Sequence, residues 1–123
     1  MILQARRYLE RHCSVMFFPE GTRSPDGRVG RFNDGAFHLA IKAGVPVMPV
    51  AVEGSRGCLP KKSWRFGKPT DIFVKVLPPV ETAGLSIDEV TALRDRVRSM
   101  IISQISQWRA TEPEAVDSLP PQP

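Results

Sequence analysis

An apolar run that leads directly into a charged turn constrains this chain more than any other feature. Residues 17–24 read FFPEGTRS, and they close an apolar run that begins at residue 14. The apolar run predicts a short buried strand, and its proline and glycine predict that the strand stops in a turn. A carboxylate, a hydroxyl and a guanidinium then lie together at the rim of a sheet, where open α/β folds bind ligands. Because arginine grips phosphate through paired hydrogen bonds, the turn indicates a phosphate site, with a solvated surface turn as the alternative.

Helix and strand patterns alternate along the rest of the chain. Helices are expected over residues 2–11 and 36–43 and strands over 47–52 and 71–77, with a loop at 54–69. This order favours an α/β fold with a small, mainly parallel sheet flanked by helices. Three strands are few for such a sheet, which favours the interpretation that the chain is part of a larger domain.

The clearest single element is a long amphipathic helix over residues 86–109. Ser86 and Glu89 have the spacing of a capping box, in which each residue satisfies an amide at the helix start. Apolar residues then recur every three or four positions, so one face is expected to close the core, with contact to lipid as the alternative. The remaining segment, 110–123, has four prolines and three acids in 14 residues and is expected to be a disordered tail.

Charge is divided unevenly between two parts of the chain. Residues 1–80 carry 13 Lys or Arg against 6 Asp or Glu, whereas residues 81–123 carry 4 against 7. The basic part, which holds the turn, suits an anionic ligand, an anionic membrane surface or nucleic acid. Because the chain shows no helix-turn-helix, zinc or RNP-type pattern, we expect no nucleic-acid partner.

Cysteine spacing and hydropathy indicate the cellular setting. Cys13 and Cys58 lie 45 positions apart without metal-ligand spacing, which predicts neither a disulfide nor a metal site and favours a reducing cytoplasmic setting. No apolar run approaches the roughly 20 residues that cross a bilayer. The N-terminus also lacks the order of charges found in a signal peptide, so neither feature is expected.

Three blocks of the sequence form an ordered set: FPEGTRS at residues 18–24, FNDGAF at 32–37 and VPVMPVAV at 45–52. They resemble, in this order, the third block, the F-x-x-G-A-F segment and the fourth block of the phospholipid/glycerol acyltransferase family. The best-known members of that family are the 1-acyl-sn-glycerol-3-phosphate (lysophosphatidate) acyltransferases. Roughly residues 5–101 follow the family pattern in order and spacing. The resemblance implies that residues 1–109 are the C-terminal part of an acyltransferase domain with a partial glycerolipid-acyltransferase fold.

The resemblance implies a reaction in phospholipid biosynthesis. An acyl group passes from a thioester donor, acyl-CoA or acyl carrier protein, to a lysophosphatidate-type acceptor, without a further cofactor or metal. It also implies peripheral contact with the cytoplasmic side of a membrane. The residues implied to hold the phosphate end of the acceptor are Glu20, Gly21, Thr22 and Arg23. The residues implied to line the acyl-chain side, with a buried core strand as an equal alternative, are Val45, Pro46, Val47 and Pro49.

The chain departs from the family pattern in two places. In the family, the catalytic histidine is followed, after four intervening positions, by an aspartate (H-x-x-x-x-D), whereas His12 and His38 have Phe17 and Ala43 there. The catalytic pair is therefore expected in an upstream half of the domain, and this chain is predicted to be inactive alone. Asp34 also stands where the family commonly has a lysine. A non-enzymatic module that binds phosphate or lipid head groups remains the alternative function.

Overall fold

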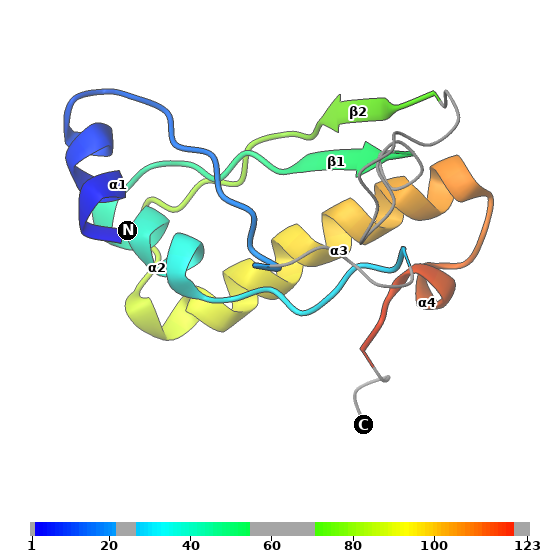
Figure 1. The fold of residues 1–123 in the computed structure, drawn as a ribbon. Coiled ribbons are helices and arrows are strands. Elements are labelled where there is room, and N and C mark those ends of the chain that lie inside the picture. Colours follow the sequence, from blue (N-terminus) through cyan, green and yellow to red (C-terminus); the bar gives the residue numbers. More distant parts are fainter. Residues whose placement is uncertain (1, 22–26, 55–70, 120–123) are drawn as a thin grey trace.

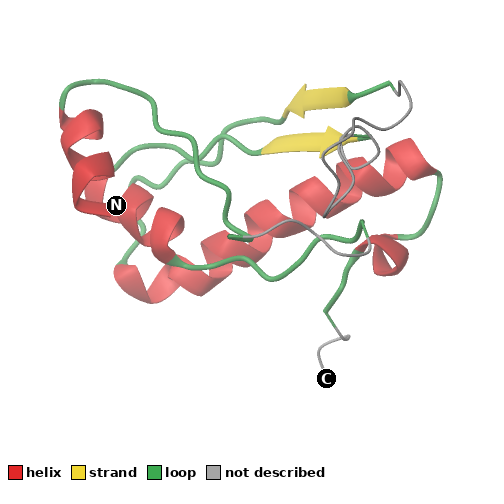
Figure 2. Cartoon of the chain, in the orientation of Figure 1, coloured by secondary structure: helices red, strands yellow, loops and turns green. Residues whose placement is uncertain are grey.

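A computed structural model of the chain describes residues 2–21, 27–54 and 71–119. Its longest element, helix α3 (Val90–Arg109), runs across the molecule beneath a small sheet (Figure 1). Helices α1 (Ile2–Glu10) and α2 (Gly35–Ala43) lie together at one end, and the short helix α4 (Pro113–Val116) lies beside α3 at the other. Figure 2 shows that much of the remaining described chain is loop. The helices expected near the N-terminus and before Gly44 are both confirmed.

The sheet has two strands, β1 (Val50–Glu53) and β2 (Phe73–Val76), which pair antiparallel with Ala51 opposite Lys75. The prediction of mainly parallel strands was wrong for this pair. Parallel neighbours need a crossover, usually a helix, whereas the stretch between these strands carries no helical pattern in the sequence. Pro49, which has no backbone N–H to donate to a neighbouring strand, directly precedes β1. The loop predicted at 54–69 lies, apart from Gly54, outside the described residues.

The two faces of the sheet differ in what covers them. On one face Ala51 is fully buried, and the ring of Phe73 lies 6.0 Å from that of Trp108 on α3. Because side chains alternate along a strand, the opposite face carries four valines. We call this surface the valine face: Val50, Val52, Val74 and Val76. Within the described part of the chain, three of these valines expose 43–60% of their surface.

Helix α3 supplies more of the core than any other single element. It begins after a short 3₁₀ turn (Ile87–Glu89), and the predicted capping box is present, with the Ser86 amide donating to Glu89 Oε2 at 2.7 Å. The side chains buried along the helix recur with helical spacing, so the prediction that this face closes the core is confirmed. They include Val90, Leu93, Val97, Ile102 and Ile105.

The expected strand at residues 14–18 is absent. Its side chains still alternate, because Val15 and Phe17 are half-buried while Met16 and Phe18 expose 74% and 80% of their surface. The segment is therefore extended, but no strand among the described residues pairs with it. A strand requires a hydrogen-bonding neighbour as well as an apolar sequence.

The C-terminal segment also differs from the expectation of a disordered tail. Residues 110–119 fold back onto α3, and Val116, in α4, is fully buried. Beyond α4 the chain forms a parallel bridge with Val29, in which the Val29 amide donates to the Val116 carbonyl at 2.8 Å. Apolar burial at Val116 and these backbone bonds outweigh the low apolar content on which the expectation rested.

Candidate functional site

The candidate site is built on a tight turn at residues 18–21. The Gly21 amide donates to the Phe18 carbonyl at 3.0 Å, which places Pro19 at the second position, where its fixed φ suits a β-turn. Gly21 has a φ of +71°, a conformation that favours glycine, and a Cβ there would lie 3.2 Å from Asn33 Nδ2. The Asn33 amide in turn donates to the Pro19 carbonyl at 2.8 Å. The turn is thus held against the segment that contains Asn33.

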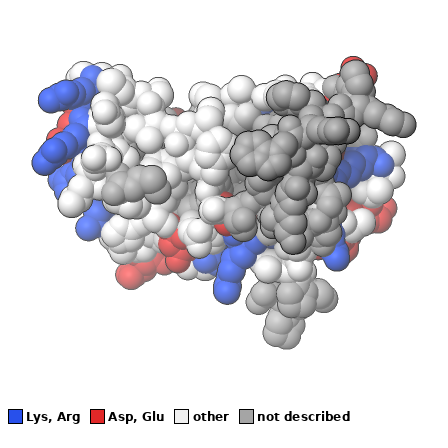
Figure 3. All heavy atoms as spheres, in the orientation of Figure 1, with Lys and Arg blue, Asp and Glu red and all other residues white. Residues whose placement is uncertain are grey.

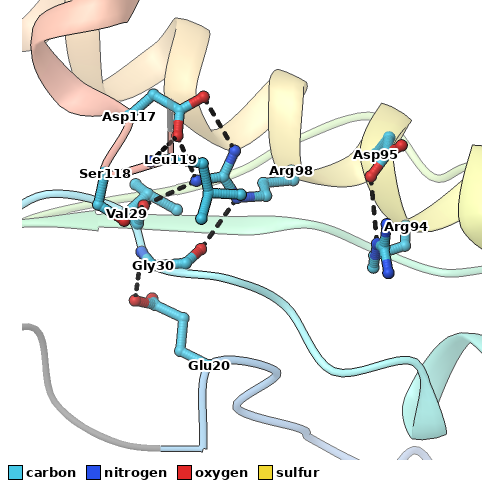
Figure 4. Close-up of polar contacts among 9 residues, drawn as sticks. All are labelled: Glu20, Val29, Gly30, Arg94, Asp95, Arg98, Asp117, Ser118 and Leu119. Atoms are coloured by element: carbon cyan, nitrogen blue, oxygen red, sulfur yellow. Dashed lines mark hydrogen bonds and ion pairs between the residues drawn. The ribbon is translucent and has the colours of Figure 1, made fainter. Parts of the chain in front are cut away.

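Glu20 points back to that segment. Its Oε2 accepts a hydrogen bond from the Gly30 amide at 2.8 Å, and the side chain is half-buried (Figure 4). A Cβ on Gly30 would lie 3.0 Å from the same oxygen, so the carboxylate sits directly against bare backbone. Of the four residues predicted to hold the acceptor, Glu20 and Gly21 thus come together in one turn. Thr22 and Arg23 lie outside the described residues.

Arg98, on the core side of α3, holds the same segment from the other direction. Its Nε donates to the Gly30 carbonyl at 2.9 Å and its Nη2 to the Val29 carbonyl at 2.8 Å. The guanidinium also lies 5.9 Å from the centre of the Phe32 ring, within cation–π range. Arg98 is 7% exposed, which is unusual for a cation and requires a compensating partner.

That partner is Asp117 in the C-terminal segment. Arg98 Nη2 and Nη1 donate to Asp117 Oδ1 and Oδ2 at 2.6 and 3.0 Å, the two-pronged geometry of strong arginine–carboxylate pairs. The Arg98 guanidinium holds the pKa of the Asp117 carboxyl below its usual range, because its hydrogen bonds outweigh the desolvation that acts the other way. Figure 4 shows Arg98 between Asp117 and the Val29–Gly30 backbone.

Neither Arg98 nor Asp117 was anticipated as part of the site. A signal was present in the sequence, because Arg98 lies four positions before Ile102 and eight after Val90, within the apolar stripe. A cation in such a stripe needs an acid nearby, and Asp117 belongs to the segment that was expected to be disordered.

The residues predicted to line the acyl-chain side belong to a separate place in the fold. Val45 and Val47 are half-buried, Pro46 is exposed and Pro49 is buried. Val47 forms an antiparallel bridge with Val80 and packs on the core. None of the described hydrogen bonds links this stretch to the turn at Glu20. The core position is what the alternative interpretation expects, and the acyl-chain role stays a prediction.

The two histidines have structural positions. His12 follows α1 with a φ of +62°, and its amide donates to the Leu9 carbonyl at 3.0 Å, so it ends the helix. His38 is half-buried on α2, and its amide donates to the Asp34 carbonyl at 2.9 Å. The Asp34 side chain pairs with Arg94 of α3 at 2.8 Å.

Basic side chains gather over the end of the molecule formed by α1 (Figure 3). Two hollows lie elsewhere, one of about 470 Å³ between Leu77 and α3 and one of about 420 Å³ between α3 and α4. Neither hollow is lined by a residue of the Glu20 turn or of the 45–49 stretch. Across the described ranges, no helix has both the length and the apolar character needed to cross a bilayer.

Comparison with known proteins defines the class. A family model described as "Acyltransferase" matches residues 1–53. The 1-acyl-sn-glycerol-3-phosphate acyltransferase alpha of Mus musculus is 42% identical over 99 residues, covering 80% of this chain and 35% of that protein. The protein of the same name from Homo sapiens has the same identity and coverage. The crystal structure of the 1-acyl-sn-glycerophosphate acyltransferase PlsC from Thermotoga maritima matches with a TM-score of 0.79 and 35% identity, over 90% of this chain and 45% of that chain.

The chain therefore belongs to the phospholipid/glycerol acyltransferase family and has part of the PlsC acyltransferase fold. It spans about a third of the length of the curated relatives it matches.

Proposed function

We propose that the protein is a 1-acyl-sn-glycerol-3-phosphate acyltransferase, in which this chain supplies part of the acceptor site and another part of the domain supplies the general base. The observation that carries the proposal is the family match over residues 1–53, because these residues include the whole turn at 17–24. The identity to lysophosphatidate acyltransferases supports the kind of acceptor. We propose acyl-CoA or acyl carrier protein as the donor.

In the proposed reaction, a glycerol hydroxyl oxygen attacks the thioester carbonyl carbon of the donor. A carbon–oxygen bond forms, the carbon–sulfur bond breaks, and the hydroxyl proton passes through a general base to the departing thiolate. Neither His12 nor His38 has the spacing of the family's catalytic pair, and one ends α1 while the other lies on α2. We therefore assign the base to another part of the domain and expect no turnover from this chain alone.

The turn is proposed to hold the acceptor's phosphate. Gly21 leaves room for close backbone approach, Thr22 offers a hydroxyl donor and Arg23 offers a permanent cation. Glu20 repels phosphate, and its carboxylate instead accepts the Gly30 amide at 2.8 Å. We assign Glu20 the task of fixing the turn so that the following residues face the ligand.

The exposed valine face supports the proposal that another part of the domain covers this side of the sheet. Val52, Val74 and Val76 expose 43%, 60% and 57% of their surface, although burying a valine side chain is worth about 1.5–3 kcal/mol. The relatives are about three times as long as the matched stretch, so they contain further chain that can form such a layer. We propose that the part of the domain that carries the base covers the valine face, so that covering the sheet and completing the active site occur together.

We also propose peripheral contact with the cytoplasmic side of a membrane, where a lysophosphatidate acceptor resides. Helix α1 supports this proposal, because Arg7 is exposed on it, Arg11 is exposed directly after it, and Leu3 and Tyr8 expose 76% and 55% of their surface. Basic and apolar side chains on one exposed helix suit an anionic lipid surface.

A chimaera tests the proposed activity. Residues 5–101 replace the matching part of the mouse relative, and labelled acyl transfer from oleoyl-CoA to lysophosphatidate is measured. We expect product from the chimaera and none from the 123-residue chain. Arg23→Ala should lower kcat/KM for lysophosphatidate by about 10–100-fold, the value of a charged hydrogen bond or two. Lys42→Ala, which removes an exposed cation of α2 outside the turn, is the matched control and should leave that value within about twofold.

The same experiment separates the alternative function. A folded chimaera that binds lysophosphatidate without transferring an acyl group would indicate a non-enzymatic head-group module. Turnover by the 123-residue chain alone would contradict the assignment of the base to another part of the domain.

A further inference from the structure

The position of Glu20 depends on the Val29–Gly30 segment, to which its carboxylate is hydrogen-bonded. Glu20 is half-buried, and its carboxylate accepts a hydrogen bond from the Gly30 amide. A Cβ on Gly30 would lie only 3.0 Å from Glu20 Oε2, so the carboxylate packs closely against this glycine. A displacement of Gly30 is therefore expected to displace the Glu20 carboxylate and, with it, the turn that contains Gly21. What fixes Gly30 thus fixes the turn.

Two elements far apart in the sequence converge on the Val29–Gly30 peptide. From α3, Arg98 donates to both carbonyls, at 2.8 Å to Val29 and 2.9 Å to Gly30. From the C-terminal segment, Ser118 donates to the Val29 carbonyl through both its amide, at 3.2 Å, and its hydroxyl, at 2.8 Å. The Val29 amide donates to the Val116 carbonyl at 2.8 Å. These bonds leave the peptide little freedom to rotate or shift.

Arg98 is itself oriented by Asp117. The two side chains share two hydrogen bonds, at 2.6 and 3.0 Å, and Arg98 is 7% exposed. A buried ion pair is weak evidence for stability, because apolar side chains of similar volume often serve as well. Its distinctive contribution is direction, since the planar guanidinium forces its remaining donors toward fixed points. Here those points are the Val29 and Gly30 carbonyls.

We propose that Arg98, oriented by Asp117, is a positioning residue that sets the place of Glu20 and so the geometry of the acceptor turn. The inference rests on the proposed function for its link to lysophosphatidate, whereas the link from Arg98 to Glu20 stands on the contacts alone. The C-terminal segment thereby becomes part of the acceptor site without touching the ligand.

Arg98→Lys keeps the positive charge but removes the planar fork, and Arg96→Lys is the matched control. Arg96 lies on the same helix, is exposed, and lines the hollow between Leu77 and α3. The first measurement, on the 123-residue chain without ligand, is the amide proton shift of Gly30 by NMR. We expect Arg98→Lys to move this signal toward its position in Glu20→Gln, and Arg96→Lys to leave it unchanged.

The second measurement is the affinity of the same variants for monomeric lysophosphatidate by calorimetry. Arg98→Lys should weaken binding about tenfold, within the range for losing a charged hydrogen bond. If Arg98 acts through Glu20, the same change on a Glu20→Gln background should cost less than twofold, because coupled residues are non-additive. If the affinity losses of Arg98→Lys and Glu20→Gln simply multiply in the double variant, Arg98 has a general structural role and the inference is overturned.

The remaining outcomes are also decisive. An unchanged Gly30 signal in folded Arg98→Lys, or unchanged affinity beside a shifted signal, overturns the inference. If Arg98→Lys does not fold, Asp117→Asn removes the orienting charge at constant shape, and the same two readouts apply. Absence of lysophosphatidate binding by the unmodified chain counts against the proposed function, while the Gly30 signal still decides whether Arg98 positions Glu20.

Discussion

The attachment of the C-terminal segment, residues 110–119, to the rest of the protein should depend on Val116. Replacing Val116 by alanine removes two methyl-sized groups from a fully buried side chain, which costs about 1.6 kcal/mol at about 0.8 kcal/mol per group. The cavity left between α4 and the core raises the expected loss to about 2–3 kcal/mol. For a chain of this size, about 1 kcal/mol corresponds to a shift of about 4 °C in Tm, so Tm should fall by about 8–12 °C.

Urea unfolding followed by circular dichroism measures this loss, with Val74→Ala as the control. Val74→Ala makes the same chemical change at a site that is 60% exposed, so the free energy of unfolding should fall by less than half as much. Equal, small losses at both sites would refute the reasoning, because they would mean that residues 110–119 are detached from the body in solution. The attachment of this segment to α3, and with it the role assigned to Asp117, would then be lost.

Three further predictions concern single features of the fold. Ala110 ends α3 with a φ of +52°, so Ala110→Gly should raise the free energy of unfolding by about 0.5–1 kcal/mol. Ala92→Gly, at an exposed site within α3, should lower it by about as much, and urea titrations of both variants check this. The pKa of Asp117 is depressed on folding, so its contribution is present above the unfolded value near 3.8 and is lost as the pH falls through the lower folded value; thermal melts from pH 7 to 2 should fall less steeply for Asp117→Asn. Thr82 is 2% exposed and donates to the Val45 carbonyl at 2.7 Å, so Thr82→Val should lower stability by about 1–3 kcal/mol in urea titrations, and a loss below about 0.3 kcal/mol would contradict this bond's importance.

Features set by local sequence were predicted well. The capping box at Ser86 and the apolar stripe of α3 each depend on residues within a turn or two of one another. The motif order also predicted the family, and the turn predicted at Pro19 is present. These patterns are readable because the physical interaction and the sequence spacing coincide.

Features that depend on distant partners were not predicted. The apolar run at 14–18 suits a strand, yet none of the described strands lies beside it to accept its hydrogen bonds. The segment at 110–119 has a disordered composition, but one buried valine and the pair with Arg98 hold it in place. In both cases the outcome depends on residues many positions away, which composition and periodicity do not report.

Helix α3 has two roles, because it holds the loop proposed to bind the acceptor as well as closing the core. Arg94 and Arg98, one turn apart, both reach to the segment at 29–34, the first to the Asp34 carboxylate and the second to the Val29–Gly30 backbone. Asp34, at the position where the family resemblance leads us to expect a lysine, lies at the start of α2, where the helix dipole favours an acid, and pairs with Arg94 at 2.8 Å. Its charge is thus balanced within the protein rather than directed at the proposed phosphate ligand. The departure from the family pattern therefore belongs to the attachment of the loop to α3, and Asp34→Lys should weaken that attachment by placing two cations together.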